Sequence, residues 1–261
     1  MNIGTAKPSA EELKGVPHYF IDSHSIETEV SAATFAREAE KLIDSLDQEY
    51  IIVTGGSGMF IDALTNGLDD IPHNDQIRSE LNNLLSEKGL DFLLEELEVK
   101  DPEYAQTVDR SNPVRVIRAL TAIRLTGKKM SDLRLGNLQS KYRVLRFIID
   151  LPREELYERI NQRMDIMIEN GLIEEIKSLF GKNNKIVMNT VGYKEFIPYL
   201  NNEISLDDAI ETAKMNSRRY AKRQLTWFRR YKDAIWLKRD NNKLMISNIL
   251  DKIKPSSEQL E

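Results

Sequence analysis

The run Gly55-Gly56-Ser57-Gly58 has the residue types that bind a phosphate group. Glycines let a ligand approach the backbone closely, and the N-terminus of a helix that follows them favours an anion. The hydroxyl of Ser57 can donate a hydrogen bond to a phosphate or to a bridging oxygen. The run is no Walker A loop, because no lysine follows it. A tight turn in which Ser57 caps a helix explains the same residues, so both interpretations stay open.

Two arginines, Arg159 and Arg163, are spaced one helical turn apart beside the apolar face of a predicted helix. Their planar guanidinium groups match the oxygen atoms of a diphosphate. The alternative is exposed salt bridges with Glu155 or Glu158, and the spacing alone favours this alternative.

The segment Lys214–Arg230 is strongly basic, because it holds seven Lys/Arg and no Asp/Glu in a chain whose net charge is −5. With a helical period, Ala221, Leu225 and Phe228 form an apolar face, and a second face is cationic. Aromatic side chains lie among the cations, as base stacking requires, although core packing accounts for Phe228 equally well. The segment predicts a helix that binds a polyanion, and a solvated basic helix is the alternative.

A second basic block covers Arg110–Arg134, where seven Lys/Arg are opposed only by Asp132. Between Asp69 and Glu103 the balance reverses, with eleven acidic and three basic residues. Charge is therefore segregated along the chain, and the overall composition hides two cationic surfaces. Two such surfaces fit a nucleic acid held between two lobes better than they fit a small anionic metabolite.

Composition excludes several classes of protein. The 261 residues suffice for one large domain or two modest ones. Without cysteine the chain has no disulfide, thiol nucleophile or Cys-based zinc site, and its three histidines lack metal-ligand spacing. No run reaches the ~20 apolar residues of a membrane helix, and the N-terminus lacks the pattern of a signal peptide. We expect a cytoplasmic monomer with no membrane partner.

The elements that must position these residues form an α/β pattern. Tyr50–Thr54 is continuously apolar and β-branched, which predicts a buried parallel strand directly before the glycine run. The predicted helix Met59–Leu64 completes a strand–turn–helix unit of the kind that faces phosphate. Further predicted strands are Tyr19–Ile21, Tyr142–Leu151 and Ala234–Leu237, and further predicted helices are Ala10–Leu13, Ala32–Leu46 capped by Ser31, Gln76–Leu97, Pro113–Leu125 ended by Gly127, and one from Pro152 to Gly171.

The predicted elements divide the chain into a core and an insertion. Strand patterns occur on both sides of residues 69–140, and only helical patterns occur within them. We therefore predict an α/β core over residues 1–68 and 141–253, interrupted by an all-helical insertion over residues 69–140. The tail, residues 254–261, is predicted to be disordered.

Six short motifs occur in order along the chain: Ile3-Gly-Thr-Ala-Lys-Pro8, Gly55-Gly-Ser-Gly58, Val114-Arg-Val-Ile-Arg-Ala-Leu120, Arg159-Ile-Asn-Gln-Arg163, Val191-Gly-Tyr-Lys194 and Ala221-Lys-Arg-Gln-Leu-Thr-Trp227. Together they resemble the bacterial tRNA dimethylallyltransferases, also called tRNA isopentenyltransferases. The resemblance extends from about Asn2 to Trp236, so it is more specific than any single motif. It implies a P-loop-kinase-like parallel sheet core with a helical insertion domain that clasps the anticodon stem-loop of tRNA.

The resemblance also implies an activity and the residues that carry it. A dimethylallyl group would pass from dimethylallyl diphosphate to N6 of adenosine 37 in tRNA, with Mg²⁺ as cofactor. Ser57 would lie near the bridging oxygen of the diphosphate and the target adenine, and Gly55 and Gly56 would adjoin the diphosphate. Arg163, with Arg159 as second choice, would neutralise the leaving diphosphate. The implied tRNA-binding residues are Arg78, Arg115, Arg118, Lys222, Arg223 and Gln224.

The chain departs from the pattern of this family at its front. Members begin with a strand, a Gly-rich P-loop ending in Lys-Thr or Lys-Ser, and an Asp-Ser-x-Gln segment with the general-base aspartate, and all of these would precede Ile3. We expect a core without that strand to expose apolar edges and unpaired backbone groups. Because the P-loop would hold the diphosphate and Mg²⁺, we expect these 261 residues alone to transfer little or no prenyl group.

Two other functions are weighed against prenyl transfer. A non-catalytic RNA-binding remnant of the same fold would keep the anticodon clasp and lose the donor site. A small-molecule or nucleotide kinase is disfavoured, because the chain contains no phosphate-binding lysine motif. Salt-dependent binding of an anticodon stem-loop would separate the RNA-binding hypotheses from the kinase.

Overall fold

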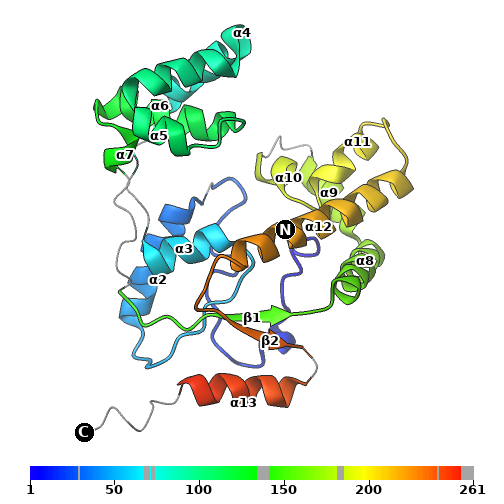
Figure 1. Ribbon diagram of the computed structural model, residues 1–261. Helices are drawn as coiled ribbons and strands as arrows, with labels where there is room; N and C mark the ends of the chain where they lie inside the picture. The colour runs from blue at the N-terminus through cyan, green and yellow to red at the C-terminus, as the bar shows by residue number, and fades with distance from the viewer. Residues whose placement is uncertain are drawn as a thin grey trace, which may run out of the picture. The chain divides into compact units, whose positions relative to one another are not determined.

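The computed structural model describes residues 1–28, 30–67, 71, 74–133, 141–180, 185–239 and 241–253. The chain forms two compact units, one made of Met1–Ile61 with Arg143–Glu261 and the other of Asp62–Tyr142 (Figure 1). It is mostly helical with a small parallel sheet, which confirms the predicted α/β class at this coarse level. The tail predicted to be disordered lies outside the described residues.

The sheet belongs to the first unit and, in the described residues, pairs two short parallel strands. Strand β1 (Phe147–Asp150) runs beside β2 (Ile235–Lys238), and the two are in register from end to end. The strands predicted at 142–151 and 234–237 are thus confirmed, the first over a shorter length. Parallel strands need a long crossover between them. The helices from α8 (Arg153–Glu169) to α12 (Leu206–Phe228) accordingly lie between β1 and β2 in the chain.

The segment Tyr50–Thr54 is not a strand, so the prediction of a buried parallel strand before the glycine run is wrong. A strand forms only where a neighbour exchanges backbone hydrogen bonds with it, and in the described residues β1 and β2 pair only with each other. Tyr50 is 54% exposed and Ile52 is 91% exposed. The apolar pattern of this segment is therefore left uncovered by the described chain.

The predicted strand Tyr19–Ile21 is also wrong. Phe20 has a backbone φ of 64°, in the left-handed region, and an extended strand cannot contain such a residue. Its ring instead lies against the ring of Phe35, with centroids 5.2 Å apart.

Helices α1 (Ala10–Leu13), α2 (Ala32–Ser45) and α3 (Gly58–Asn66) form where the sequence predicts them. Ser31 caps α2 as predicted, because its side chain accepts a hydrogen bond from the backbone N–H three residues later. Phe35 of α2 contacts Phe60 of α3, with ring centroids 5.4 Å apart. The start of α3, which follows the glycine run directly, is thereby tied to α2.

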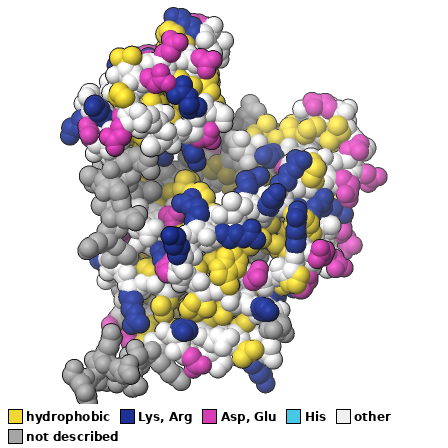
Figure 2. Space-filling view, in the orientation of Figure 1, with side chains coloured by type: hydrophobic (Ala, Val, Ile, Leu, Met, Phe, Trp, Pro, Cys, Tyr) yellow, Lys and Arg dark blue, Asp and Glu magenta, His cyan; other side chains and the backbone are white. Residues whose placement is uncertain are grey.

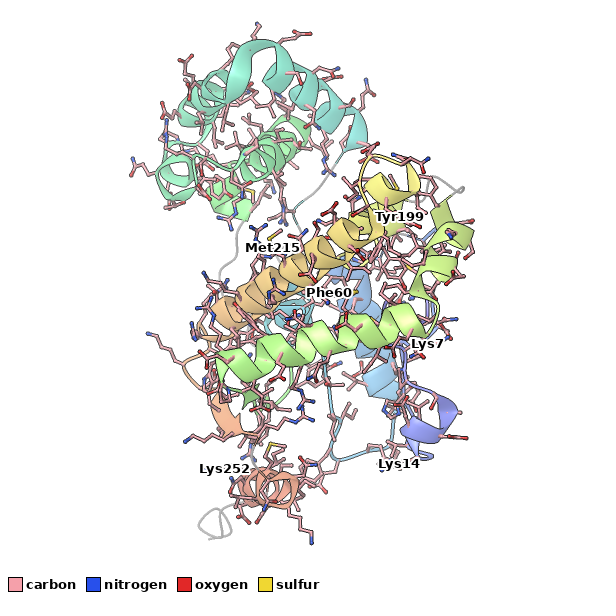
Figure 3. All side chains as sticks on the ribbon, turned by 90° about the vertical axis from the view of Figure 1, so that its right-hand side faces the viewer. Lys7, Lys14, Phe60, Tyr199, Met215 and Lys252 are labelled. Carbon is pink, nitrogen blue, oxygen red and sulfur yellow. The ribbon has the colours of Figure 1, made fainter. Side chains whose placement is uncertain are left out.

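Helices α8 (Arg153–Glu169) and α12 (Leu206–Phe228) pack side by side in the first unit (Figures 1 and 3). The helix predicted between Pro152 and Gly171 is confirmed. The predicted basic helix is also confirmed, and it begins before the basic residues do. Buried small residues on α12, Ala209 and Ala213, leave room for Met164 of α8. The elements between them are α9 (Leu172–Phe180), α10 (Lys185–Asn189), η1 (Lys194–Phe196) and α11 (Ile197–Leu200), and α13 (Asn242–Ile253) follows β2.

The apolar face predicted for the basic helix is only partly correct. Ala221, Leu225 and Phe228 are half-buried, whereas the fully buried residues of α12 lie nearer its N-terminus. Phe228 ends the helix and stacks on Tyr231, with ring centroids 6.2 Å apart. The C-terminal half of α12 therefore keeps much of its surface available to a partner.

The second unit is helical in its described residues after α3. It contains α4 (Asp75–Lys100), α5 (Pro102–Thr107), α6 (Pro113–Thr126) and α7 (Met130–Leu133). The helices predicted at 76–97 and 113–125 are confirmed, although a positive φ of 83° at Gly89 kinks α4. Fully buried residues that form its core include Leu81, Leu93, Leu97, Val116 and Leu120.

A buried carboxylate holds the short helices of the second unit together. Asp101 is fully buried; it caps α5 by accepting a hydrogen bond from the Tyr104 N–H at 3.0 Å. It also accepts hydrogen bonds from the backbone N–H and the hydroxyl of Ser131, at 2.8 and 3.0 Å. Burial alone would raise the pKa of Asp101, but these hydrogen bonds outweigh burial and lower it.

Among the described helices, none combines the length and apolar character needed to cross a membrane.

Candidate functional site

The glycine turn (residues 55–58) packs against one face of α12. A Cβ atom added to Gly56 would collide with the side-chain amide of Gln224, and one added to Gly58 would collide with the indole ring of Trp227. Neither glycine has a φ in the left-handed region, so each is required here for its lack of a side chain. Gln224, a residue expected to bind tRNA, is half-buried at this contact.

Ser57 begins α3 through its backbone. Its carbonyl oxygen accepts hydrogen bonds from the N–H groups of Phe60 and Ile61, each at 3.1 Å. Its hydroxyl makes no hydrogen bond within the described residues, so the side chain does not cap the helix. A Cβ added to the neighbouring Gly55 would meet open space. The turn therefore offers a half-buried hydroxyl without a protein partner beside an open stretch of backbone at a helix N-terminus.

The structure joins two of the sequence motifs through a carboxylate that sequence reasoning missed. Glu175 of α9 accepts hydrogen bonds from three consecutive backbone N–H groups, those of Asn2 (2.6 Å), Ile3 (3.1 Å) and Gly4 (3.2 Å). It also accepts one from the Tyr193 hydroxyl at 2.6 Å. Gly4 lies so close to the Tyr193 ring that no Cβ would fit. Nothing in the local sequence around Glu175 signals this role, because all four donors are distant in the chain.

The same contacts shift the pKa values of both side chains. Burial would raise the pKa of Glu175, but the hydrogen bonds from Tyr193 and from the three backbone amides outweigh burial, so its pKa is lowered. Burial, together with the hydrogen bond to the Glu175 carboxylate, raises the pKa of Tyr193. The pair therefore keeps an ionised carboxylate and a neutral phenol over the whole neutral range.

The two arginines predicted to bind diphosphate lie on the exposed surface of α8. Arg159 is 3.9 Å from Glu155 one turn earlier, and both side chains are about half exposed. Such a pair contributes little to stability, so Arg159 can leave it for a ligand at small cost. Arg163 is exposed and forms no ion pair with any described residue. In the described residues no hydrogen bond or ion pair joins either arginine to the glycine turn.

The contact between α8 and α12 holds two further cations that are half-buried. Lys214 lies 2.7 Å from Asp165 and 3.2 Å from Glu211, and hydrogen bonding to Asp165 is the main cause that raises the pKa of Lys214. Arg218 donates to the side-chain oxygen of Asn161 at 2.6 Å. The sequence predicts a cationic face on this helix but does not identify Asn161 as a partner. The spacing in the sequence was a usable signal for this contact. Asn161 and Asp165 are four residues apart, so they lie on one face of α8. Lys214 and Arg218 have the same spacing on α12.

Exposed cations continue along the C-terminal half of α12. Lys222 and Arg223, both expected to bind tRNA, are exposed, and Arg223 lies over the ring of Tyr220 at 5.4 Å. Arg230 lies over the ring of Trp227 at 4.4 Å. Figure 2 shows Lys and Arg side chains gathered on the face of the first unit that carries α12 and α8. This surface combines phosphate-binding charge with aromatic faces, as single-stranded RNA requires.

In the second unit, the structure separates the basic residues into two kinds. Arg78 on α4 and Arg115 and Arg118 on α6 are exposed, and they form no ion pair within the described residues. These three are the tRNA-binding positions expected in this unit. Their guanidinium groups are available to a polyanion.

Two other arginines of the second basic block, Arg110 and Arg124, have structural partners. Arg124 donates two hydrogen bonds to Glu96, at 2.9 and 2.5 Å, and the pKa of Arg124 is raised by this bidentate contact. Arg110 donates to Glu98 at 2.6 Å. The acidic residues that precede this block in sequence therefore neutralise part of it, which charge counting along the chain could not show.

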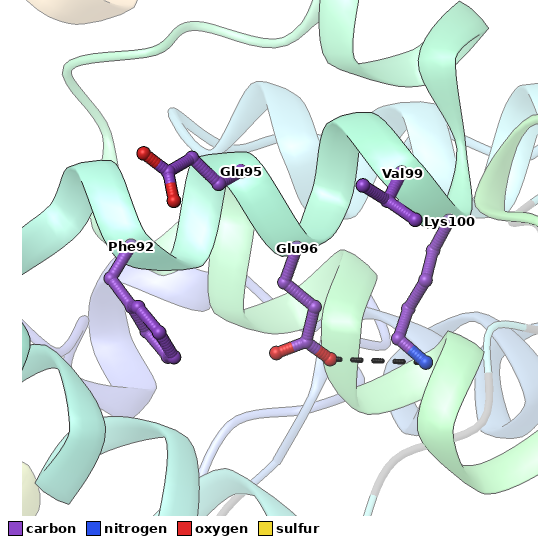
Figure 4. Close-up of a pocket in the computed structure, with 5 residues that line it drawn as sticks. All are labelled: Phe92, Glu95, Glu96, Val99 and Lys100. Atoms are coloured by element: carbon purple, nitrogen blue, oxygen red, sulfur yellow. Dashed lines mark ion pairs between the residues drawn. The ribbon is translucent and has the colours of Figure 1, made fainter.

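A hollow of about 320 Å³ opens on one side of α4, and none of the expected site residues lines it (Figure 4). Phe92, Glu95, Glu96, Val99 and Lys100 line it, and Lys100 lies 3.9 Å from Glu96. The hollow is open and mainly apolar, and its lining comes from a single helix. It lacks the converging polar groups of a small-molecule site.

The described residues hold no preformed cluster of metal ligands. No group of three or more His, Asp or Glu side chains occurs among them in positions to hold a metal. At the glycine turn the donors are a hydroxyl and an amide, whereas Mg²⁺ prefers carboxylate and phosphate oxygens. Mg²⁺, the cofactor that the family resemblance implies, therefore stays a prediction.

Comparison with known proteins decides the family. The model of the IPP transferase family matches residues 1–231. The chain belongs to this family. It is 41% identical to the tRNA dimethylallyltransferase of Cytophaga hutchinsonii over 240 residues, which cover 90% of this chain and 79% of that protein. It is also 41% identical to the tRNA dimethylallyltransferase of Clostridioides difficile, over 92% of this chain and 79% of that protein. The resemblance seen in the sequence is confirmed.

Solved structures agree with this assignment. The tRNA isopentenylpyrophosphate transferase of Bacillus halodurans superposes with a TM-score of 0.68 and 36% identity, covering 97% of this chain and 82% of that chain. A eukaryotic dimethylallyltransferase studied while acting on tRNA superposes with a TM-score of 0.79 and 26% identity, covering 98% of this chain and 71% of that chain.

Proposed function

We propose that this chain is a tRNA dimethylallyltransferase that moves a dimethylallyl group from dimethylallyl diphosphate to N6 of adenosine 37. The observation that carries the proposal is the meeting of two features in one unit. The turn, whose Ser57 hydroxyl makes no hydrogen bond within the described residues, packs directly on the helix that presents the exposed cations and aromatic rings. Membership of the IPP transferase family and the names of the relatives support the same conclusion.

The reaction forms one bond and breaks another. The N6 nitrogen attacks C1 of the dimethylallyl group, the bond from C1 to the diphosphate oxygen breaks, and one proton leaves N6. Because an active site cannot reach N6 while the adenine is stacked in the RNA, the base must be turned out before it can react. In our proposal the Ser57 hydroxyl donates a hydrogen bond to the bridging oxygen, which carries the developing negative charge of the leaving diphosphate. We assign no general base among these residues.

Two arginines on α8 complete the donor site in this proposal. Arg163, with Arg159 in support, neutralises the leaving diphosphate by the paired hydrogen bonds that a planar guanidinium makes to phosphate oxygens. The exposed state of both side chains leaves their donors available. Gly55, which faces open space, lets a diphosphate approach the backbone of the turn.

Contacts to RNA are proposed on both units. Lys222 and Arg223 would bind the backbone near the target adenosine, and Tyr220 would offer a face for stacking. The helical unit would clasp the anticodon stem-loop through Arg78, Arg115 and Arg118, which form no ion pair within the described residues. We further propose a P-loop-kinase-like core, a monomeric state, Mg²⁺ as cofactor and a cytoplasmic site of action, as the family resemblance implies.

Transfer of label under single-turnover conditions tests the proposal. Enzyme in excess is mixed with radiolabelled dimethylallyl diphosphate and an anticodon stem-loop that carries adenosine 37, so that slow chemistry is still detected. The matched control stem-loop carries guanosine at this position and offers no N6 amine. We expect label only in the adenosine stem-loop, and less of it with the Ser57→Ala variant. Binding of the stem-loop without any label in it would refute the catalytic proposal.

A further inference from the structure

The contact between the glycine turn and α12 assigns a role to two side chains beyond RNA binding. We propose that Gln224 and Trp227 are positioning residues, which hold the turn so that the Ser57 hydroxyl stays fixed at the start of α3. For its kinetic readout this inference rests on the proposed prenyl transfer. It differs from the tRNA contact expected for Gln224.

The geometry of the contact supports this role. Gln224 and Trp227 are three residues apart on α12, so they lie on the same face of the helix. They meet Gly56 and Gly58, the two residues on either side of Ser57, and at both positions the side chain occupies the space of the missing Cβ. The residue between the two contacts is therefore held from both sides.

The helix that provides these side chains is itself anchored. Glu195 is buried and accepts hydrogen bonds from the Gly192 N–H at 2.8 Å and from the side-chain amide of Asn216 at 2.9 Å. Two and a half turns before Trp227, Arg218 is held by Asn161 of α8. A helix fixed at these points can serve as a support for the turn, because a site keeps its geometry only if the groups behind it are themselves held.

The two contacts should respond differently to an added methyl group. The amide of Gln224 is the end of a flexible side chain and can swing away from Gly56→Ala. The indole ring of Trp227 cannot yield in this way, so Gly58→Ala must move the turn or the helix. We therefore expect Gly58→Ala to have the larger effect.

Paired substitutions test the inference. Kinetics are measured for Gly58→Ala, Trp227→Leu and the double variant, and likewise for Gly56→Ala with Gln224→Ala. We expect each single variant to lower the single-turnover rate at saturating donor, on the order of 10-fold or more for Gly58→Ala, with stem-loop affinity within about 2-fold. Each double variant should be faster than its glycine variant alone. Thr226→Ala, exposed on the same helix, is the matched control.

Two results would overturn the inference. One is a loss of stem-loop affinity in Gln224→Ala with an unchanged rate, which would make this side chain an RNA contact. The other is additive losses in the double variants. Hydrogen exchange of the backbone amides of residues 54–61 tests the same contact without any catalysis, with faster exchange expected in the single variants and partial recovery in the doubles. If the unaltered chain transferred no prenyl group, the proposed function would fail while the exchange result still decided this inference.

Discussion

Replacing Glu175 should destabilise the first unit by an amount that its four hydrogen bonds set. In Glu175→Gln, the amide oxygen can still accept from Asn2 and Ile3, while the new NH₂ group faces Gly4 and the hydroxyl of Tyr193. Tyr193 can rotate its hydroxyl to accept, but the Gly4 N–H loses its acceptor, and the remaining bonds lose the help of a charge. Hydrogen bonds to charged groups contribute about 1.5–3 kcal/mol and neutral ones about 0.5–1.5 kcal/mol.

From these values we expect Glu175→Gln to cost about 1–2 kcal/mol of the free energy of unfolding. Glu175→Ala, which removes every acceptor, should cost about 3 kcal/mol. The loss of unfolding free energy is limited because Asn2 is exposed, and water can replace the lost carboxylate as acceptor at its N–H. Tyr193→Phe removes the hydrogen bond to Glu175 inside a buried contact and should cost about 1 kcal/mol.

Urea unfolding, followed by circular dichroism at neutral pH, measures these differences. The decisive quantity is the coupling between the two sites in a double-mutant cycle of Glu175→Gln with Tyr193→Phe. Because the two side chains share a hydrogen bond, the losses should not add, and the coupling should be at least about 0.5 kcal/mol. A Glu175→Gln variant as stable as the unaltered chain, with additive effects in the cycle, would refute the reasoning. Exposed Glu174 on the same helix provides the control as Glu174→Gln.

Three further predictions concern pH, packing and RNA. Because the pKa of Glu175 is lowered in the folded state, the stabilisation by its carboxylate is fully present above 4.5, the ordinary pKa of this group. This stabilisation is lost as the pH falls through the folded-state pKa. The loss of unfolding free energy caused by Glu175→Gln should therefore shrink in acid unfolding curves. Asp101→Ala should lower the free energy of unfolding of the helical unit by about 2–4 kcal/mol, because it leaves donors on Tyr104 and Ser131 unpaired. Thermal unfolding measures this, and an unchanged midpoint would contradict it. Lys222→Ala should reduce the slope of stem-loop affinity against salt by about 1, whereas Arg124→Ala should leave the slope unchanged, as filter binding at several salt concentrations would show.

Helices could be predicted from the sequence because their signals are local. Ser31 before α2, Pro113 at the start of α6 and Gly127 after its end are residues whose own chemistry starts or stops a helix, whatever surrounds them. The strand predicted at Tyr50–Thr54 failed for the opposite reason. An apolar β-branched run forms a strand only beside a neighbour, and no local pattern states which neighbour is there.

In the candidate site, too, the local motifs could be predicted and the contacts between distant residues could not. The motifs identified the glycine turn, the arginines of α8 and the basic helix, because each is a short run of characteristic residues. Their contacts could not be read in this way. The resemblance implied that Gln224 binds tRNA together with Lys222 and Arg223, yet its side chain turns towards Gly56. Half a turn about the helix axis decides whether a side chain of α12 faces RNA or packs against the protein. The sequence around residue 224 is compatible with either direction.

One physical device recurs at three of the contacts that the sequence could not show. At Gly4, and twice more in the glycine turn, a glycine lies against a larger side chain from a distant segment, and a Cβ would not fit. Gly127 is different, because its φ of 71° demands glycine while the space around it is open. An alanine at Gly4 should therefore be partly rescued by trimming its partner in Tyr193→Leu, whereas no neighbouring substitution can rescue Gly127→Ala. Unfolding free energies of these single and double variants would separate a demand for space from a demand for backbone conformation. If Tyr193→Leu failed to improve Gly4→Ala, the close packing would not be what requires glycine there.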